Sequence, residues 1–379
     1  MDNLAHTLVG LAAAKAGLER ASPYATAVCV VAANAPDADI VAALKGRWFY
    51  LQHHRGITHS VVGTLALALF IPLVFYGVER LIARLRGGPP RVRLGGLVVA
   101  SIVASATHPL LDWTNSYGVR PFLPWSGKWY YGDLVFIVDP WLWLALGGAA
   151  FLATARTRAR TALWSAFALA LTAVIVFLPV RADLPAAARF VWLAGVLTFA
   201  VAHRLGFGAR LGRLAPAAAL ALVPCYWGAL AVAHAGALRR GVGVVSELAG
   251  ANGEAAARVA AMPSLANPAR WRVVGETERA DYVFDLSLAE TADGADAWKA
   301  RASRHEKLSG ADAARVARLA ATDERARIFL DFARFPLARI SRPPGEAARA
   351  QLFDVRFAGP GTDPRRATFA AEFPLDPAR

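Results

Sequence analysis

The sequence has few cysteines and few charged residues. Its two cysteines, Cys29 and Cys225, lie within apolar stretches, which excludes a disulfide framework and a CxxC metal site. Charged residues make up 18% of the chain and hydrophobic residues 56%. A typical soluble domain has about 25% charged residues, so this composition favours a membrane protein. The 379 residues are enough for a membrane domain and one soluble domain.

Acidic residues are also scarce relative to basic ones. The chain has 42 lysine and arginine residues against 28 aspartate and glutamate residues, a net charge of +14. Such a charge can indicate nucleic-acid binding. Here the arginines lie mainly between apolar segments, and no compact basic motif with interleaved aromatic residues is present, so we expect no nucleic-acid partner. The amino terminus has Asp2 in place of a basic region, and we expect no cleavable signal peptide.

Several apolar runs are long enough to cross a bilayer, which takes about 20 residues. The clearest runs are residues 57–78, 94–112, 134–154, 161–180, 188–204 and 214–235, and two weaker runs are 4–19 and 24–43. The second weak run is interrupted by Pro36, Asp37 and Asp39, and charges at that depth are costly unless they pair or bind something. The sequence therefore predicts an all-α polytopic membrane domain of about six to eight helices.

The loops between these runs predict the orientation of the chain. Three arginine-rich loops, at residues 80–93, 156–160 and 204–213, alternate with loops that contain fewer basic residues. Basic loops tend to remain in the cytoplasm, so these three are predicted to be cytoplasmic. The histidine and aspartate motifs described below then all lie on the extracytoplasmic side of the membrane.

The last 140 residues differ in character from the rest. Short runs that alternate apolar and polar residues, bounded by Gly, Pro and Asp, predict β-strands. The predicted strands are residues 271–274, 282–288, 327–332 and 352–357. A helix is predicted near residues 309–321. We therefore divide the chain into a membrane domain, residues 1–238, and a small soluble α+β domain, residues 239–379, which the last crossing places outside the cytoplasm.

Five of the eight histidines lie in the first 110 residues, close to several aspartates. Histidine nitrogen and carboxylate oxygen together suit zinc, manganese or iron better than calcium or magnesium. The first motif, His6-Thr7-Leu8-Val9-Gly10, could by itself be an interfacial histidine. The second is Asn34-Ala35-Pro36-Asp37-Ala38-Asp39. Its proline interrupts a helix, so that Asp37 and Asp39 could both face a cation, unless the segment is a simple turn with solvated acids.

The third motif is His53-His54-Arg55-Gly56-Ile57-Thr58-His59-Ser60. Gly56 permits a tight turn through which His54 and His59 could converge. Arg55 could neutralise an anionic substrate group such as a phosphate. The alternative is a histidine-rich loop at the membrane interface.

In the fourth motif, His108 and Asp112 share one helix face because they are four residues apart. Both could bind one metal, or Asp112 could orient His108, and an isolated hydrogen-bonded pair is the alternative. Asp133 and Asp139 follow within a segment rich in tryptophan and tyrosine, which is typical of a membrane interface. Either aspartate could be a further ligand or a carboxylate that orients one.

The order of these motifs, HTxxG, NxPDxD, HHRGxTHS and HPxxD, resembles the YdjM-like family of bacterial inner-membrane proteins, described as metal-dependent hydrolases. The resemblance covers about residues 1–180, and HHRGITHS is its most specific part. It implies a hydrolase embedded in the membrane. It also implies metal-binding roles for His6, Asp37, Asp39, His54, His59, His108 and Asp112.

Because there are more candidate ligands than the four that one tetrahedral zinc ion uses, we expect one to three divalent ions. Zinc is favoured over manganese and iron. A metal-activated water would attack an ester or phosphoester. Arg55 would stabilise the developing charge, and Asp39 or Asp133 would act as general base. The position in the membrane favours an amphiphilic, lipid-like or phosphorylated substrate.

Two other functions are compatible with the sequence. A transporter or metal-ion permease would place polar residues in both halves of the membrane, whereas the polar cluster here is confined to one face. A scaffold whose helices are fastened by metal would have a closed site with no open position on the ion.

Overall fold

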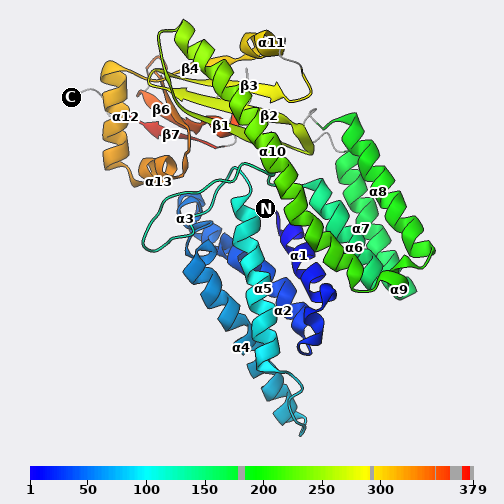
Figure 1. Cartoon of the computed structure of the whole chain (residues 1–379). Coiled ribbons are helices and arrows are strands. Elements are labelled where there is room, and N and C mark those ends of the chain that lie inside the picture. The colour runs from blue at the N-terminus through cyan, green and yellow to red at the C-terminus, as the bar shows by residue number, and fades with distance from the viewer. Residues whose placement is uncertain (178–183, 291–293, 346, 359–368, 376–379) are drawn as a thin grey trace. The chain divides into compact units, whose positions relative to one another are not determined.

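The computed structural model describes residues 1–177, 184–290, 294–345, 347–358 and 369–375. The chain divides into two compact units (Figure 1). The first consists of Met1–Ile40, Arg55–Ala231 and Ser264–Asn267, and the second of Val41–His54, Val232–Pro263 and Pro268–Arg379. The boundary that the sequence suggests, at residues 238 and 239, lies within one long helix, α10 (Leu214–Ala251), and the division into those two domains stays a prediction.

The first unit consists mainly of helices, with an irregular segment at residues 114–139. Its elements include α1 (Asn3–Ala16), α2 (Ala25–Asn34), the 3₁₀ segments η2 (Ala35–Lys45) and η3 (Ile57–His59), α4 (Val61–Leu85), α5 (Leu94–Trp113), α6 (Pro140–Thr154), α7 (Arg158–Val176), α8 (Ala186–Arg204) and α9 (Phe207–Leu211). Among the described residues, six helical segments are long and apolar enough to cross a membrane: α2 with η2, α4, α5, α7, α8 and α10. The predicted all-α polytopic membrane domain is confirmed.

Small residues let the first helices pack closely. A Cβ atom added at Gly10 of α1 would lie 2.7 Å from the carbonyl oxygen of Cys29 in α2. The interface of α2 with α5 is built mainly from alanines such as Ala32 and Ala100, which are fully buried. Glycine and alanine at helix contacts are typical of membrane bundles, where close backbone approach replaces the hydrophobic effect.

The helix α6 is shorter than its apolar run. The sequence suggests a span from residue 134, but the helix begins at Pro140 and has 15 residues. Asp139 caps it, since one carboxylate oxygen accepts from the backbone N–H groups of Trp141 and Leu142 at 2.8 and 3.1 Å. An aspartate cap followed by proline at the first helical position is a strong start signal, and it prevents residues 134–139 from continuing the helix.

The second unit contains two antiparallel sheets in the part of the chain that the structure describes. The first sheet has the order β1 (Ala256–Ser264), β2 (Asn267–Thr277), β3 (Ala280–Ser287) and β4 (Ser303–Glu306), and the second β5 (Pro336–Ser341), β6 (Arg349–Asp354) and β7 (Ala370–Pro374). Three helices lie between or beside these strands in the sequence, α11 (Gly294–Arg301), α12 (Gly310–Thr322) and α13 (Glu324–Phe332). The predicted α+β domain after the membrane helices is confirmed.

The first sheet of this unit is buried on both faces. Trp271, Phe284 and Trp298 pack in a core that also contains the carboxyl-terminal half of α10. On the other face, Val283 packs in a second core with Phe353 of the second sheet. Alternate residues of a strand point to opposite faces, so one strand can contribute to both cores.

One predicted strand of this domain is wrong. Residues 327–332 form the greater part of α13, in which Ile328, Phe329 and Phe332 are buried on one helix face. Asp323 caps this helix by accepting from the backbone of Arg325 at 2.8 Å. The end of another predicted strand, residues 355–357, is a 3₁₀ turn.

A short helix from the early part of the chain belongs to the second unit. This helix, α3 (Arg47–His53), packs against α13. A guanidinium nitrogen of Arg47 donates to the carbonyl oxygen of Ala370 at 3.1 Å, and the ring of Trp48 lies 5.7 Å from that of Phe373. The chain therefore leaves the first unit after Ile40 and returns to it at Arg55.

Candidate metal centre

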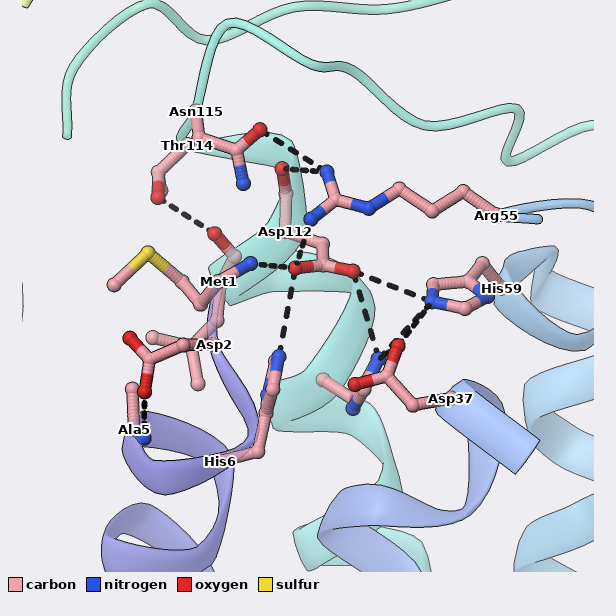
Figure 2. A network of polar contacts seen from close by, with 12 residues as sticks. Met1, Asp2, Ala5, His6, Asp37, Arg55, His59, Asp112, Thr114 and Asn115 are labelled. Atoms are coloured by element: carbon pink, nitrogen blue, oxygen red, sulfur yellow. Dashed lines mark hydrogen bonds and ion pairs between the residues drawn. The ribbon is translucent and has the colours of Figure 1, made fainter. Parts of the chain in front are cut away.

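Three elements of the first unit bring four metal-ligating side chains together. Asp37 comes from η2, His59 from η3, and His108 and Asp112 from the end of α5. One potential ligand atom from each of the four lies within 4.8 Å of all the others (Figure 2). Among the residues that the structure describes, this is the group with metal-binding spacing.

The distances within the group match those between the ligands of one small cation. The Nε2 atom of His59 lies 3.1 Å from Nε2 of His108, 3.3 Å from Asp37 and 3.2 Å from Asp112. Nε2 of His108 lies 3.5 Å from each of the same two carboxylates. Ligands of a tetrahedral zinc ion, each about 2.0–2.1 Å from the metal, are about 3.3 Å apart, so the donor set fits such an ion.

The outer nitrogen of each histidine is held by another group. Nδ1 of His108 donates to the carbonyl oxygen of Ala33 at 2.6 Å. Nδ1 of His59 lies 3.3 Å from Asp39 and 3.1 Å from the hydroxyl of Thr58. With the proton on Nδ1, the lone pair of Nε2 points into the cluster, as metal coordination requires.

Asp37 and Asp39 lie on opposite sides of His59. The sequence suggests that both could face one cation, but η2 is a 3₁₀ helix with three residues per turn. Residues two apart then point about 240° apart around the axis. Asp37 reaches the Nε2 side of His59 and Asp39 the Nδ1 side. Asp39 also accepts from the backbone N–H of Arg55 at 2.8 Å and from Thr58 at 3.1 Å, which suits it to orienting the ring.

Arg55 holds the other side of Asp112. Its guanidinium donates to Asp112 Oδ1 at 2.9 Å and to Asn115 Oδ1 at 3.0 Å, and it lies over the ring of Tyr117 at 4.7 Å. It also donates to the carbonyl oxygen of Gly118 at 3.2 Å and is 3% exposed. These contacts commit the guanidinium to the protein, so they favour positioning of Asp112 over direct binding of a substrate anion.

The turn before His59 differs from the predicted one. The residue with positive φ is Arg55, at 51°, and not Gly56. The glycine that the packing requires here is Gly63, because a Cβ atom at that position would lie 1.8 Å from the carbonyl oxygen of Ile57. The first turn of α4 therefore fits against the 3₁₀ turn that carries His59.

His6 lies beside the four-residue group. Its ring stacks on that of His108 with centroids 3.7 Å apart, and its Nε2 is 3.4 Å from Asp112 Oδ1. Both ring nitrogens are buried without a hydrogen-bond partner. The amino group of Met1 contacts the same carboxylate oxygen of Asp112 (Figure 2). His6 thus faces the oxygen of Asp112 that points away from His59.

The two later aspartates have different environments. Asp133 is 4% exposed, and its neighbours Gly132 and Leu134 donate backbone hydrogen bonds of 2.7 Å to residues at the end of α5. These bonds hold the segment of Asp133 beside the helix that carries Asp112. Asp139 caps α6 and accepts from the hydroxyl of Tyr226 at 2.9 Å, which gives it a structural role.

His54 belongs to the second unit, whereas the four-residue group belongs to the first. Its ring stacks on Tyr50 of α3 with centroids 4.6 Å apart. Nδ1 of its neighbour His53 donates to the carbonyl oxygen of Phe49 at 2.8 Å. The ligand role of His54 stays a prediction that the geometry does not support.

Some residues of the motifs have roles that their sequence did not suggest. Thr58 fixes Asp39, and the side-chain amide of Asn34 donates to the hydroxyl of Thr7 at 3.0 Å, which joins the first two motifs. Both residues are small polar groups inside motifs otherwise defined by histidine and aspartate. Their position within the motifs was the feature of the sequence from which these roles could have been predicted.

The burial of the site indicates what it needs. His59, His108 and Asp112 are fully buried, and Asp112 Oδ2 has no hydrogen-bond partner. Two carboxylates brought together in a buried site repel each other unless a cation lies between them. Two imidazole nitrogens with two carboxylate oxygens, and no thiolate, form the donor set of a divalent transition metal.

The fold and this group define a polytopic membrane protein with a candidate metal centre. Residues 1–182 match the family model described as YdjM inner membrane protein, which confirms the resemblance in the motifs over this part of the chain.

The chain is also similar to a protein of Bacillus subtilis (strain 168) named "Uncharacterized protein YfhP". The two are 28% identical over 153 residues, which cover 38% of this chain and 44% of the relative. The matched part thus spans less than half the length of that relative. No solved structure matches the chain.

Proposed function

We propose that the chain is a membrane-bound, metal-dependent hydrolase of ester or phosphoester bonds. Its metal ligands would be Asp37, His59, His108 and Asp112. The observation that carries the proposal is the convergence of two imidazole nitrogens and two carboxylate oxygens within 4.8 Å of one another. The two nitrogens are 3.1 Å apart and lie 3.2–3.5 Å from the carboxylates, and the outer imidazole nitrogens are already engaged.

A divalent ion held by these residues would supply a Lewis acid and lower the pKa of a coordinated water molecule. The spacing favours zinc, with manganese and iron as alternatives. Four protein ligands complete a tetrahedral zinc, which expands to five-coordinate in some transition states. Manganese or iron in octahedral geometry would retain two further positions.

The contacts of Asp112 favour one ion out of the one to three that the sequence suggests. Its Oδ2 atom faces His59 and His108, whereas its Oδ1 atom accepts from the guanidinium of Arg55 at 2.9 Å. A second cation between Oδ1 and His6 would be repelled by that fixed positive charge. His6 then supports the ring of His108 by stacking.

Three residues are the candidates for moving protons or stabilising charge: Asp39, Asp133 and Arg55. Asp39 accepts from the backbone N–H of Arg55 and the hydroxyl of Thr58 and lies 3.3 Å from Nδ1 of His59, which suits it to orienting the ring rather than to acting as general base. That leaves Asp133, buried beside the end of α5, as the proposed general base. For Arg55 we propose that it holds Asp112 in place, so that its effect on the reaction is indirect.

The substrate that we propose is amphiphilic, with a lipid-like part and an ester or phosphoester. The support is the location of the ligands in and beside helices that are apolar enough to cross a membrane. Trp113, Trp125 and Trp129 lie in or just after α5, and tryptophans of this kind favour the interface where a headgroup would lie.

The first test is the metal content of the detergent-purified protein by plasma mass spectrometry. We expect one equivalent of a divalent transition metal in the wild type and its loss in His59→Ala and in Asp37→Ala. His203→Ala is the matched control, because its ring in α8 lies against that of Phe151 in α6, with centroids 4.7 Å apart, and is not part of the cluster, so the metal content should be unchanged. Metal retained in both site variants would contradict the assignment.

The second test is hydrolysis of chromogenic phosphodiesters and esters with short and long alkyl chains. We expect turnover that is removed by a chelator, restored by the metal found in the first test, and faster for long chains. Tight stoichiometric metal without turnover of any of these compounds, and with loss of folding on chelation, would favour a metal-fastened scaffold instead.

A further inference from the structure

Three helices of the first unit enclose an apolar pocket. Its volume is about 300 Å³, and it is lined by residues of α6, α7 and α8. Ligand-binding pockets in proteins are mostly apolar and have volumes of about 300–1,000 Å³. Few side chains fill the space between these helices: in α7 the buried residue is Ile175, and in α8 they are Ala188 and Trp192.

The indole N–H groups of the tryptophans that line the pocket are already engaged within the protein. The indole N–H of Trp192 donates to the hydroxyl of Thr172 at 3.0 Å, and that of Trp164 to the hydroxyl of Thr154 at 2.8 Å. The indole of Trp143 donates to the carboxylate that caps α1 at 3.0 Å. The wall therefore offers mainly hydrocarbon and aromatic surface, which suits an alkyl chain better than a polar ligand.

The pocket and the candidate metal centre are on different sides of α6. Leu144, Gly148 and Phe151 line the pocket, whereas Leu142 and Leu146 belong to the core that includes residues of α1. With 3.6 residues per turn, these two sets occupy opposite faces of the helix. An inference about the pocket therefore does not rest on the proposed hydrolase.

The surroundings of the pocket indicate what would fill it. Both α7 and α8 are apolar enough to cross a membrane. Leu169, in the pocket wall, is 70% exposed, and Leu197 of α8 is 64% exposed, so the pocket is continuous with the surface that lipid would cover. Water does not enter an apolar cavity readily, and an empty one forfeits packing energy. Hydrocarbon from the bilayer would fill the cavity and restore the packing without needing any hydrogen-bond partner.

We propose that the pocket between α6, α7 and α8 is a binding site for one acyl chain of a membrane phospholipid. The acyl chain lies against the rings of Trp164 and Phe199, and the headgroup of the phospholipid remains outside the pocket. Gly148 sets the depth of the site, since a Cβ atom there would lie 2.2 Å from the ring of Phe199.

The test is native mass spectrometry of the full chain. The protein is reconstituted with phosphatidylglycerol and phosphatidylethanolamine and is then extracted and washed in a maltoside detergent before the measurement. We expect one phospholipid per chain to survive washing that removes other lipids. The variants Ala168→Phe and Ala200→Phe fill the pocket from α7 and α8, and each should lose that phospholipid. Ala166→Phe is the matched control, exposed on α7 outside the pocket lining, and should retain it.

A second measurement uses the wild type alone, so that it does not depend on how the variants fold. Phosphatidylcholine with brominated acyl chains should quench tryptophan fluorescence in a saturable way at low mole fraction, because Trp143, Trp164 and Trp192 line the pocket. No retained phospholipid together with quenching that is only linear in mole fraction would overturn the proposal. So would retention of phospholipid by both filled variants, or occupation by detergent alone.

Discussion

The two nitrogens of His59 have different partners, and this difference organises the candidate site. Nε2 faces Asp37, His108 and Asp112, whereas Nδ1 faces Asp39. A carboxylate bound to the outer nitrogen of a metal-binding histidine fixes the tautomer and the direction of the ring. The two aspartates of one motif therefore have separate tasks.

This separation predicts graded losses of metal affinity. Asp39→Asn should weaken binding by about 10–100-fold, since that is the usual effect of removing an orienting partner. Asp37→Asn should weaken it further, because it removes a ligand. The affinities can be measured by competition with a chromogenic chelator.

His54→Ala provides the control at the neighbouring motif position and should retain wild-type affinity. Equal losses in Asp37→Asn and Asp39→Asn, or a loss in His54→Ala, would contradict these assignments.

The sequence predicts which residues are candidate ligands better than it predicts where their side chains point. The i, i+4 spacing places His108 and Asp112 on one face of α5, and their side chains do converge. Asp37 and Asp39 could face one cation only if Pro36 turned the backbone out of the helix, whereas the backbone continues as the 3₁₀ helix η2, in which residues two apart point in different directions. His54 ends a short segment of a unit whose other segments begin only at Val232, and no local pattern contains that information.

At the scale of the elements, the contact between η3 and α4 fixes the position of His59. Gly63→Ala should displace the turn, because the new Cβ atom would lie 1.8 Å from the backbone oxygen of Ile57. Inserting a methyl group into a tightly packed site costs about 1–3 kcal/mol, and here it would also weaken metal binding. Thermal unfolding in detergent and metal content measure the two effects.

Gly77→Ala is the matched control on the same helix. Nothing lies within 4 Å of a Cβ atom at that position, and alanine favours a helix over glycine by about 0.5–1 kcal/mol. Stability should be unchanged or slightly higher. If Gly63→Ala behaves in the same way, the packing argument for η3 fails.

The helices were easier to predict than the strands. Long apolar runs identify the membrane helices, although their ends shift where a cap such as Asp139 intervenes. Residues 327–332 alternate well enough to resemble a strand, yet Ile328, Phe329 and Phe332 also share one helix face. The aspartate cap at Asp323 was the signal that distinguishes the two, and the alternation outweighed it in the sequence.

The strand β3 makes the stability of the second unit depend on pH. Burial raises the pKa of Asp281 to about 7, and the ammonium of Lys307, 3.7 Å away, opposes this shift. In an unfolded chain the pKa of an aspartate is about 3.9. Between these values the folded state retains a proton that the unfolded state has lost. The free energy of unfolding should therefore fall as pH rises from about 4 to 7, by up to about 1.4 kcal/mol per unit.

Amide hydrogen exchange of the β3 peptide at pH 5.5 and 7.5, corrected for intrinsic rates, measures this dependence. Protection should be greater at the lower pH in the wild type, and Asp281→Asn should remove the difference. An unchanged difference in that variant would assign the pH dependence to other groups, such as His305, which is opposite Asp281 in β4.

At the scale of the whole molecule, we propose that the candidate metal centre and the second unit are extracytoplasmic. The support is the alternation of arginine-rich and arginine-poor loops, which favours a cytoplasmic location for residues 80–93. In a background with Cys29 and Cys225 replaced by alanine, an impermeant maleimide should label Lys128→Cys in intact cells. Gly88→Cys should react only after the cells are opened. The reverse pattern would invert the orientation.

The course of the chain through α3 has a consequence for truncation experiments. Residues 41–54 connect Asp39 to Arg55, but they fold with strands and helices from the far end of the sequence. A deletion of everything after residue 238 would remove the partners of Trp48. Residues 41–54 would then be an unfolded connection between two segments that both contribute to the metal centre. Loss of metal in such a fragment would result from the unfolding of this connection. It would not show that the second unit supplies metal ligands.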